Sequence, residues 1–144
     1  MTKDMNSRRV KDEMTKSVVS VSPDDSVSEA ITIMADYRVT VLPITDKKSR
    51  CVGILSTTDL VDPQRWQKEG TLDEPNVNFD DRRVGDVMTS EVESVNRETP
   101  LVKATGTMLR QRVHHLPVVD ENQQLLGIIS TLDLLAAFHK AHDP

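Results

Sequence analysis

The chain has 144 residues, of which 37% are hydrophobic and 28% charged, and its formal net charge is −5. This length predicts one ordinary domain or two very small ones, and the acidic balance argues against a general nucleic-acid binder. A single cysteine, Cys51, excludes an intramolecular disulfide framework and a cysteine-rich zinc site. No apolar stretch approaches the roughly 18 residues of a membrane span, and the polar N-terminus lacks the apolar core of a signal peptide. We therefore expect a soluble, cytoplasmic protein that does not bind membranes.

The sequence repeats itself at an offset of 74 residues. Residues 8–60 align with residues 82–134 without a gap, and 22 of the 53 aligned positions are identical. A unit of this size buries too little surface to be stable alone. The predicted organisation is a first repeat at 8–60, a connector at 61–81 and a second repeat at 82–138, with the two repeats sharing one core.

Each copy predicts the same elements in chain order. A polar opening, Arg-Arg-Val-x-Asp-x-Met-Thr, precedes a short β-branched run at 18–21 or 92–95 that predicts a strand. Residues 22–26 supply turn and cap residues for a helix. The apolar stripe of this helix is Val27, Ala30, Ile31, Met34 and Tyr37 in the first copy, and Leu101, Ala104, Thr105, Met108 and Leu109 in the second.

Two strands and a last helix complete each copy. The first strand, at 41–44 or 116–119, contains a proline, which belongs at a strand start or edge. A polar turn and a glycine-bearing strand at 51–55 or 125–129 follow, and the last helix opens at Ser-Thr-x-Asp-Leu. The predicted fold class is therefore α+β (mixed α/β), with two β-α-β-β-α repeats.

The segments 53–60 and 127–134 each pass from a strand into a helix and carry a serine three residues before an aspartate. Ser-x-x-Asp is the pattern of a capping box, and on its own it favours that local role. The same geometry can also hold a nucleotide, because a helix N-terminus attracts phosphate and a carboxylate can accept hydrogen bonds from ribose hydroxyls. Both interpretations stay open at this point.

These motifs resemble those of tandem CBS-domain proteins, which carry a pair of cystathionine-β-synthase-type motifs called a Bateman module. The resemblance rests on V-x-D-x-M-T, L-P-[IV]-[VT]-D and G-I-[LI]-S-T-x-D-L in both copies, and it covers residues 8 to about 138. It implies two repeats packed by their sheets with pseudo-twofold symmetry, and clefts between them for adenine-bearing ligands. The expected regulatory ligand is AMP, ADP or ATP, with S-adenosylmethionine or NAD(H) as further options, and no cofactor is required.

The resemblance also implies roles for individual residues. Asp59 and Asp133 would hold ribose. Neighbouring hydroxyls and the residues before Leu-Pro would hold phosphate, namely Ser56, Thr57, Thr58, Ser130, Thr131, His114 and His115. Because aromatic residues make up only 3% of the chain, adenine is expected between aliphatic side chains, with ordinary core packing as the alternative for each: Val18, Val41, Leu42, Pro43, Val92, Leu116 and Pro117.

The two copies differ before Leu-Pro, where the first has Thr40-Val41 and the second has His114-His115. A site that combines the aspartate of one repeat with these residues of the other would join Asp59 and Thr58 to the histidine pair. Imidazoles titrate near neutral pH, so phosphate affinity would rise on acidification. The alternative for the histidine pair is a solvent-exposed turn.

Catalysis and metal binding are not predicted. No nucleophile has a recognisable base, and His139 and His142 lack an obvious third ligand. The pairs Arg8-Arg9 and Arg82-Arg83 are interpreted as solvated, although nucleic-acid binding through them is an alternative that the net charge disfavours. The predicted function is a stand-alone regulatory module, a homodimer, that signals ligand binding to an unidentified protein partner in trans. The alternative is a structural dimerisation or scaffold module with degenerate pockets.

Overall fold

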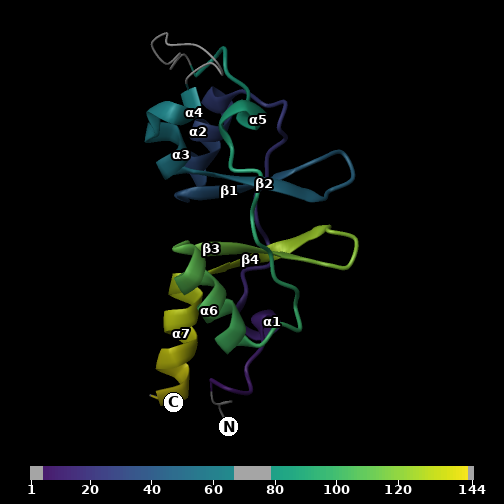
Figure 1. The fold of residues 1–144 in the computed structure, drawn as a ribbon, viewed down its shortest axis with the longest axis vertical. Coiled ribbons are helices and arrows are strands. Elements are labelled where there is room, and N and C mark those ends of the chain that lie inside the picture. The colour runs from purple at the N-terminus through teal and green to yellow at the C-terminus, as the bar shows by residue number, and fades with distance from the viewer. Residues whose placement is uncertain (1–4, 67–78, 143–144) are drawn as a thin grey trace. The chain divides into compact units, whose positions relative to one another are not determined.

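The computed structural model describes residues 5–66 and 79–142, without the side chains of residues 63 and 66 (Figure 1). The chain forms two compact units, which we describe separately. The first-repeat unit comprises Val19–Val92, and the second-repeat unit comprises Met1–Val18 together with Glu93–Pro144. Residues 67–78 of the predicted connector at 61–81 lie outside the described residues.

The first-repeat unit is a two-stranded antiparallel sheet with helices packed against it. Its elements are α2 (Val27–Tyr37), β1 (Val41–Thr45), β2 (Cys51–Ser56), α3 (Thr57–Val61), α4 (Pro63–Trp66) and α5 (Val84–Val87). Strand β1 pairs with β2 so that Val41 lies opposite Ser56. Helix α2 contacts β1, and α3 contacts β2 (Figure 1). The buried core includes Val27, Leu42, Leu55 and Val84.

The second-repeat unit has the same plan. Its elements are α1 (Val10–Glu13), α6 (Leu101–Gln111), β3 (His115–Val119), β4 (Leu125–Ser130) and α7 (Thr131–His142). Strands β3 and β4 pair antiparallel, with His115 opposite Ser130. Helices α6 and α7 lie against one face of this sheet (Figure 1). No helix in the residues that the structure describes has the length and apolar character of a membrane span. The predicted mixed α/β class is confirmed.

The strand predicted at the start of each repeat is reduced to one bridging residue. Val21 pairs with Ile44, and Val95 pairs with Val118, both in parallel orientation. A turn begins directly after each valine, at Ser22 and at Asn96, and ends the extended segment. The Val21 N–H donates to the Pro43 carbonyl oxygen at 3.2 Å, so Pro43 faces the edge of β1 that pairs only through this bridge. The N–H that proline lacks therefore removes no hydrogen bond from the β1–β2 pairing.

Most residues of the predicted helical stripes are buried, Ile31 and Thr105 are half-buried, and two are exposed. Val27, Ala30, Leu101 and Ala104 are fully buried, and Met34 and Met108 nearly so. Tyr37 is 60% exposed and Leu109 is 74% exposed, so these two residues of the apolar stripes do not face the core. Tyr37 is the last residue of α2, before the left-handed Arg38. Leu109 is turned about 100° around the helix from Met108, and the buried Thr107 takes part in the core face instead.

The Ser-Thr-x-Asp-Leu segment starts helices of different length in the two units. Helix α3 has 5 residues and α7 has 12. Pro63 follows α3 after a single residue, Asp62, which has an extended backbone. A proline cannot continue a helix and disfavours helical geometry at the residue before it. The second repeat has no proline at the equivalent position, and α7 therefore continues.

Each compact unit contains the opening segment of the other repeat. In the second-repeat unit, Val10 is fully buried and Thr15 pairs with Ile128 in β4. In the first-repeat unit, Val84 is fully buried and Thr89 pairs with Ile54 in β2. The alignment could not reveal this exchange, since both openings read Arg-Arg-Val-x-Asp-x-Met-Thr and offer the same contacts.

Gly53 and Gly127 allow these opening segments to cross the strands. A Cβ on Gly53 would lie 2.8 Å from both the Met88 sulfur and the Thr89 carbonyl oxygen, and a Cβ on Gly127 would meet the Thr15 carbonyl oxygen.

We expect Gly53→Ala and Gly127→Ala each to lower the free energy of unfolding by about 1–3 kcal/mol through overpacking, measured by urea denaturation. Gly106→Ala is the control: its Cβ meets only the flexible end of Arg110, and alanine favours the helix. Equal effects at all three positions would contradict this account.

Candidate functional site

Both Ser-x-x-Asp segments form capping boxes. In the first-repeat unit the Ser56 N–H donates to Asp59 Oδ2 at 2.9 Å, and the Asp59 N–H donates to Ser56 Oγ at 3.3 Å. In the second-repeat unit the Ser130 N–H donates to Asp133 Oδ2 at 2.9 Å, and the Asp133 N–H donates to Ser130 Oγ at 3.1 Å. The local capping interpretation is therefore confirmed in both copies. It occupies Oδ2 of each aspartate and leaves Oδ1 for other partners.

In the first-repeat unit, Oδ1 of Asp59 is held by two side chains that the motifs did not indicate. It accepts a hydrogen bond from the Thr89 hydroxyl at 3.0 Å, and Nε of Arg65 lies 3.6 Å away. Arg65 Nη2 also donates to the Thr89 hydroxyl oxygen at 3.2 Å. Asp59 is only 6% exposed. Thr89 could have been suspected from the repeated Met-Thr pair, whereas Arg65 lies in the connector and belongs to no motif.

In the second-repeat unit, Asp133 is half-buried and lies among predicted phosphate-binding residues. The Thr131 N–H donates to the carbonyl oxygen of His114 at 2.9 Å, and His115 pairs with Ser130 across the sheet. Asp133 lies close enough to His115 to raise the pKa of its imidazole. The fold therefore brings five predicted residues together, which we call the Asp133 cluster: Ser130, Thr131, Asp133, His114 and His115.

The pKa of His115 lies below its ordinary value of 6.5. Burial lowers this pKa most, the neighbouring His114 lowers it further, and Asp133 raises it. His115 is thus neutral in the folded protein at pH values where the unfolded chain already binds a proton.

We therefore expect an acid-sensitive contribution of His115 to stability. This contribution is complete above about pH 6.5 and is lost as the pH falls toward the lower folded-state pKa, because the unfolded state then binds more protons. Urea midpoints at pH 7.5 and pH 5.5 should differ more for the wild type than for His115→Gln. A His139→Gln variant is the control, because it removes an exposed imidazole that is not among the groups shifting the pKa of His115. An equal pH dependence of the wild type and His115→Gln would contradict the expectation.

The equivalent residues of the first-repeat unit lie together in the same way. The Thr57 N–H donates to the Thr40 carbonyl oxygen at 3.0 Å, and Thr57 and Thr58 are exposed beside Ser56 and Asp59. Neither Thr40 nor Val41 offers a cation to a phosphate. The predicted combination of Asp59 with the histidine pair joins residues of the two separately described units, and it stays a prediction.

The aliphatic candidates for the adenine pocket differ in burial. Leu42 and Leu116 are each 1% exposed and belong to the hydrophobic cores of their units. Val41, Pro43 and Pro117 are buried in the strands, and Val18 and Val92 are half-buried. Leu42 and Leu116 thus fit ordinary core packing, which is the alternative to a role in an adenine pocket.

The arginine pairs make internal contacts. Arg8 is 7% exposed and pairs with the buried Glu13, so its interpretation as a solvated residue was wrong. Arg9 Nη1 donates to the Glu98 carbonyl oxygen at 2.6 Å, and Arg83 Nη1 donates to that of Asp24 at 3.5 Å. Arg82 Nε lies 3.9 Å from Asp86 Oδ2. The Arg8–Glu13 salt bridge lies within the opening segment, and Lys140 Nζ of α7 connects its acid to the rest of the second-repeat unit at 3.2 Å.

The described part of the chain contains no group of three or more His, Cys, Asp or Glu side chains able to hold a metal ion. His142 instead shares a hydrogen bond with the Phe138 carbonyl oxygen at 3.0 Å. Its ring stacks on the Phe138 ring with centroids 4.3 Å apart.

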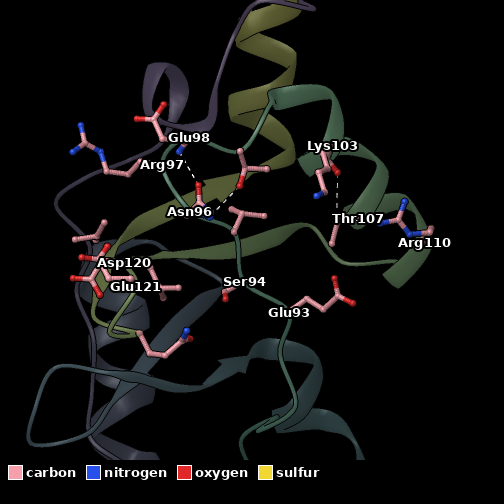
Figure 2. A pocket seen from close by; sticks show the side chains of 15 residues that line it. Glu93, Ser94, Asn96, Arg97, Glu98, Lys103, Thr107, Arg110, Asp120 and Glu121 are labelled. Carbon is pink, nitrogen blue, oxygen red and sulfur yellow. Dashed lines mark hydrogen bonds between the residues drawn. The ribbon is translucent and has the colours of Figure 1, made fainter.

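A separate groove of about 980 Å³ lies on the second-repeat unit, between residues 93–99, α6 and the turn after β3 (Figure 2). Its charged lining mixes cations with acids: Arg97, Lys103, Arg110, Glu93, Glu98, Asp120 and Glu121. None of the predicted site residues lines it. The mixed charge gives no preference for an anionic ligand, and the Asp133 cluster remains the better candidate site.

Known proteins share both the motifs and the fold. The profile of the CBS domain family matches residues 10–63 and 84–140. The chain belongs to the CBS domain family. Inosine-5'-monophosphate dehydrogenase from Methanocaldococcus jannaschii is 33% identical over 120 residues, which are 83% of this chain and 21% of the dehydrogenase. This CBS pair thus spans about a fifth of that relative's length. The CBS domain-containing protein YhcV from Bacillus subtilis is 30% identical over 125 residues, 87% of this chain and 81% of YhcV.

Two solved structures resemble the CBS pair along most of its length. CBSX2, solved in complex with AMP, has a TM-score of 0.75 and 28% identity, and the match covers 90% of this chain and 94% of CBSX2. The CBS domain pair of MJ0100, solved in complex with 5'-methylthioadenosine and S-adenosyl-L-methionine, has a TM-score of 0.76 at 23% identity. That match covers 91% of this chain and 95% of the MJ0100 pair, and it shows a shared fold.

Proposed function

We propose that this CBS pair is a regulatory module that binds an adenosine nucleotide of the AMP, ADP or ATP type. The observation that carries the proposal is the similarity to CBSX2, which was solved with AMP and is 28% identical over 90% of this chain. The Ser-x-x-Asp segments support it, because each presents an aspartate beside hydroxyl groups at the start of a helix. The proposed role is ligand sensing in the cytoplasm rather than catalysis.

We assign the ribose to the aspartates and the phosphate to the groups around them. Oδ1 of Asp133 is suited to the ribose hydroxyls because the capping box uses only Oδ2. Thr131, His114 and His115 would donate to phosphate, as would Thr57 and Thr58 in the first-repeat unit. The adenine would lie against half-buried and strand aliphatic residues such as Val18, Val41 and Val92.

We propose that ligand binding is signalled to a partner protein and that the module is a homodimer. A ligand can shift a protein between two states only if it binds them with different affinities. Sedimentation of the purified chain with and without AMP tests this part. A change in the sedimentation coefficient on adding AMP would support a change of shape or assembly, and an unchanged monomer would contradict the homodimer.

Thermal unfolding with millimolar AMP, ADP, ATP, S-adenosylmethionine and NADH tests ligand binding. A ligand present at about 100 times its dissociation constant adds roughly 2.7 kcal/mol, which raises the melting temperature by several degrees. We expect a shift with an adenine nucleotide that is lost in the double variant Asp59→Ala/Asp133→Ala. The paired variant His114→Ala/His115→Ala should reduce the response to AMP more than the response to adenosine. If no compound produces a shift, the scaffold alternative is favoured instead.

A further inference from the structure

Both carboxylate oxygens of Asp59 have partners in its own unit. The Ser56 N–H and the Ser56 hydroxyl contact Oδ2 at 2.9 Å and 3.2 Å. The Thr89 hydroxyl and the Arg65 guanidinium contact Oδ1 at 3.0 Å and 3.6 Å. An ionised carboxylate offers about four lone-pair positions. Three hydrogen bonds therefore use three of these positions, and a ribose hydroxyl that approaches Oδ1 must compete with the Arg65 guanidinium beside it.

The aspartate of the second repeat is engaged differently. Within the residues that the structure describes, the hydrogen bonds of the Asp133 side chain involve only Oδ2, and the residue is half-buried rather than buried. Position 139, the counterpart of Arg65 at the 74-residue offset, is a histidine. Thr15, the counterpart of Thr89, is exposed, whereas Thr89 is half-buried against Asp59. The two carboxylates thus differ in their readiness to accept a ligand.

We propose that Arg65 and Thr89 form a latch on Asp59 and that Arg65 sets a difference in affinity between the two nucleotide sites. The inference rests on the proposed function and specifies how the sites divide the binding. The Asp133 site binds the adenosine moiety first. The Asp59 site binds the adenosine moiety only after Arg65 has left Asp59. Because this contact must be broken, the observed affinity of the Asp59 site for adenosine is lower.

Arg65 is the part of the latch that moves. The Arg65 side chain is 39% exposed, and its Nε lies 3.6 Å from the carboxylate, so this ion pair is weak and can be exchanged for water. Thr89 is fixed through its backbone, because its N–H donates to the Ile54 carbonyl at 2.8 Å and its carbonyl accepts the Ile54 N–H at 2.9 Å. When Arg65 swings into solvent, Oδ1 of Asp59 keeps only the Thr89 hydroxyl and can accept a ribose hydroxyl.

Isothermal titration with adenosine tests this latch, because adenosine carries no phosphate that Arg65 could attract. The background variant Asp133→Ala removes the acceptor at position 133 and leaves Asp59 as the remaining ribose acceptor. In that background, Arg65→Met is expected to strengthen adenosine binding by about two- to fivefold, the gain from removing a weak, part-exposed ion pair that competes for Oδ1. Gln64→Met alters the exposed neighbouring position of α4 and is expected to leave the affinity unchanged.

Weaker or unchanged adenosine binding in Arg65→Met, with the melting temperature showing a folded protein, would overturn the latch. A readout without ligand separates this result from failure of the proposed function. Urea denaturation gives the free energy of unfolding of Arg65→Met, Asp59→Asn and the double variant. The loss in the double variant should differ from the sum of the two single losses, since the two side chains contact each other. Additive losses overturn the latch even if nucleotides bind. Non-additive losses without binding of adenosine or AMP by any variant support the contact and reject the nucleotide function.

Discussion

Glu13→Ala is expected to lower the free energy of unfolding by about 3–5 kcal/mol, the usual cost of removing one member of a buried ion pair. The Glu13 side chain is 4% exposed and pairs with Arg8, whose side chain is 8% exposed. Lys140 Nζ of α7 lies 3.2 Å from the other carboxylate oxygen. Removing the carboxylate takes the Glu13 partner away from the buried Arg8 guanidinium and breaks the ion pair between Glu13 and Lys140 of α7.

Urea denaturation of Glu13→Ala beside Glu98→Ala measures this effect. Glu98 contacts Lys11 at 2.9 Å, but its side chain is 65% exposed, so its loss is expected to cost less than about 1 kcal/mol. The double variant Arg8→Met/Glu13→Leu should recover most of the stability, because it removes both buried charges and fills their space with apolar groups. Similar losses in Glu13→Ala and Glu98→Ala would contradict a large contribution of the buried pair to stability.

The sequence predicts features that depend on neighbouring residues. The capping boxes at Ser56 and Ser130 use groups only three residues apart, and the Ser26 cap on α2 accepts from Glu29 in the same way. The polar turns are also local, since Asp46 accepts from the backbone of Lys48 and Arg50. Repetition at a fixed offset strengthens the capping boxes and the aspartate turns, which both copies contain, but not the Ser26 cap, whose counterpart is Pro100.

Features that depend on distant partners were not predictable from the motifs. Arg8 is buried because Glu13 and the second-repeat unit enclose it, although an Arg-Arg pair near a terminus favours a solvated interpretation. Arg65 contacts Asp59 because α4 follows α3 after one residue, and nothing in the connector's composition indicates that contact. The Ser-Thr-x-Asp-Leu segment is the same in both copies, whereas the three-dimensional contacts distinguish Asp59 from Asp133.

The largest expected effect on binding follows from this difference. Asp133→Ala should weaken AMP binding at the high-affinity site by about 10- to 100-fold, since a hydrogen bond to a charged group contributes about 1.5–3 kcal/mol. Asp59→Ala should change that site little and affect only the weaker one. Isothermal titration with AMP at fixed pH and salt measures both dissociation constants.

The free energies of unfolding of Asp133→Ala and Asp59→Ala distinguish a loss of binding from a loss of folding. Both substitutions remove the acid of a capping box, so each is expected to lower the free energy of unfolding by about 0.5–2 kcal/mol. Asp59→Ala also leaves the Arg65 and Thr89 side chains without their carboxylate partner and should therefore be the more destabilising of the two. Binding and stability are thus expected to respond in opposite order at the two positions. A larger loss of AMP affinity in Asp59→Ala than in Asp133→Ala would instead make the first-repeat aspartate the main ribose acceptor.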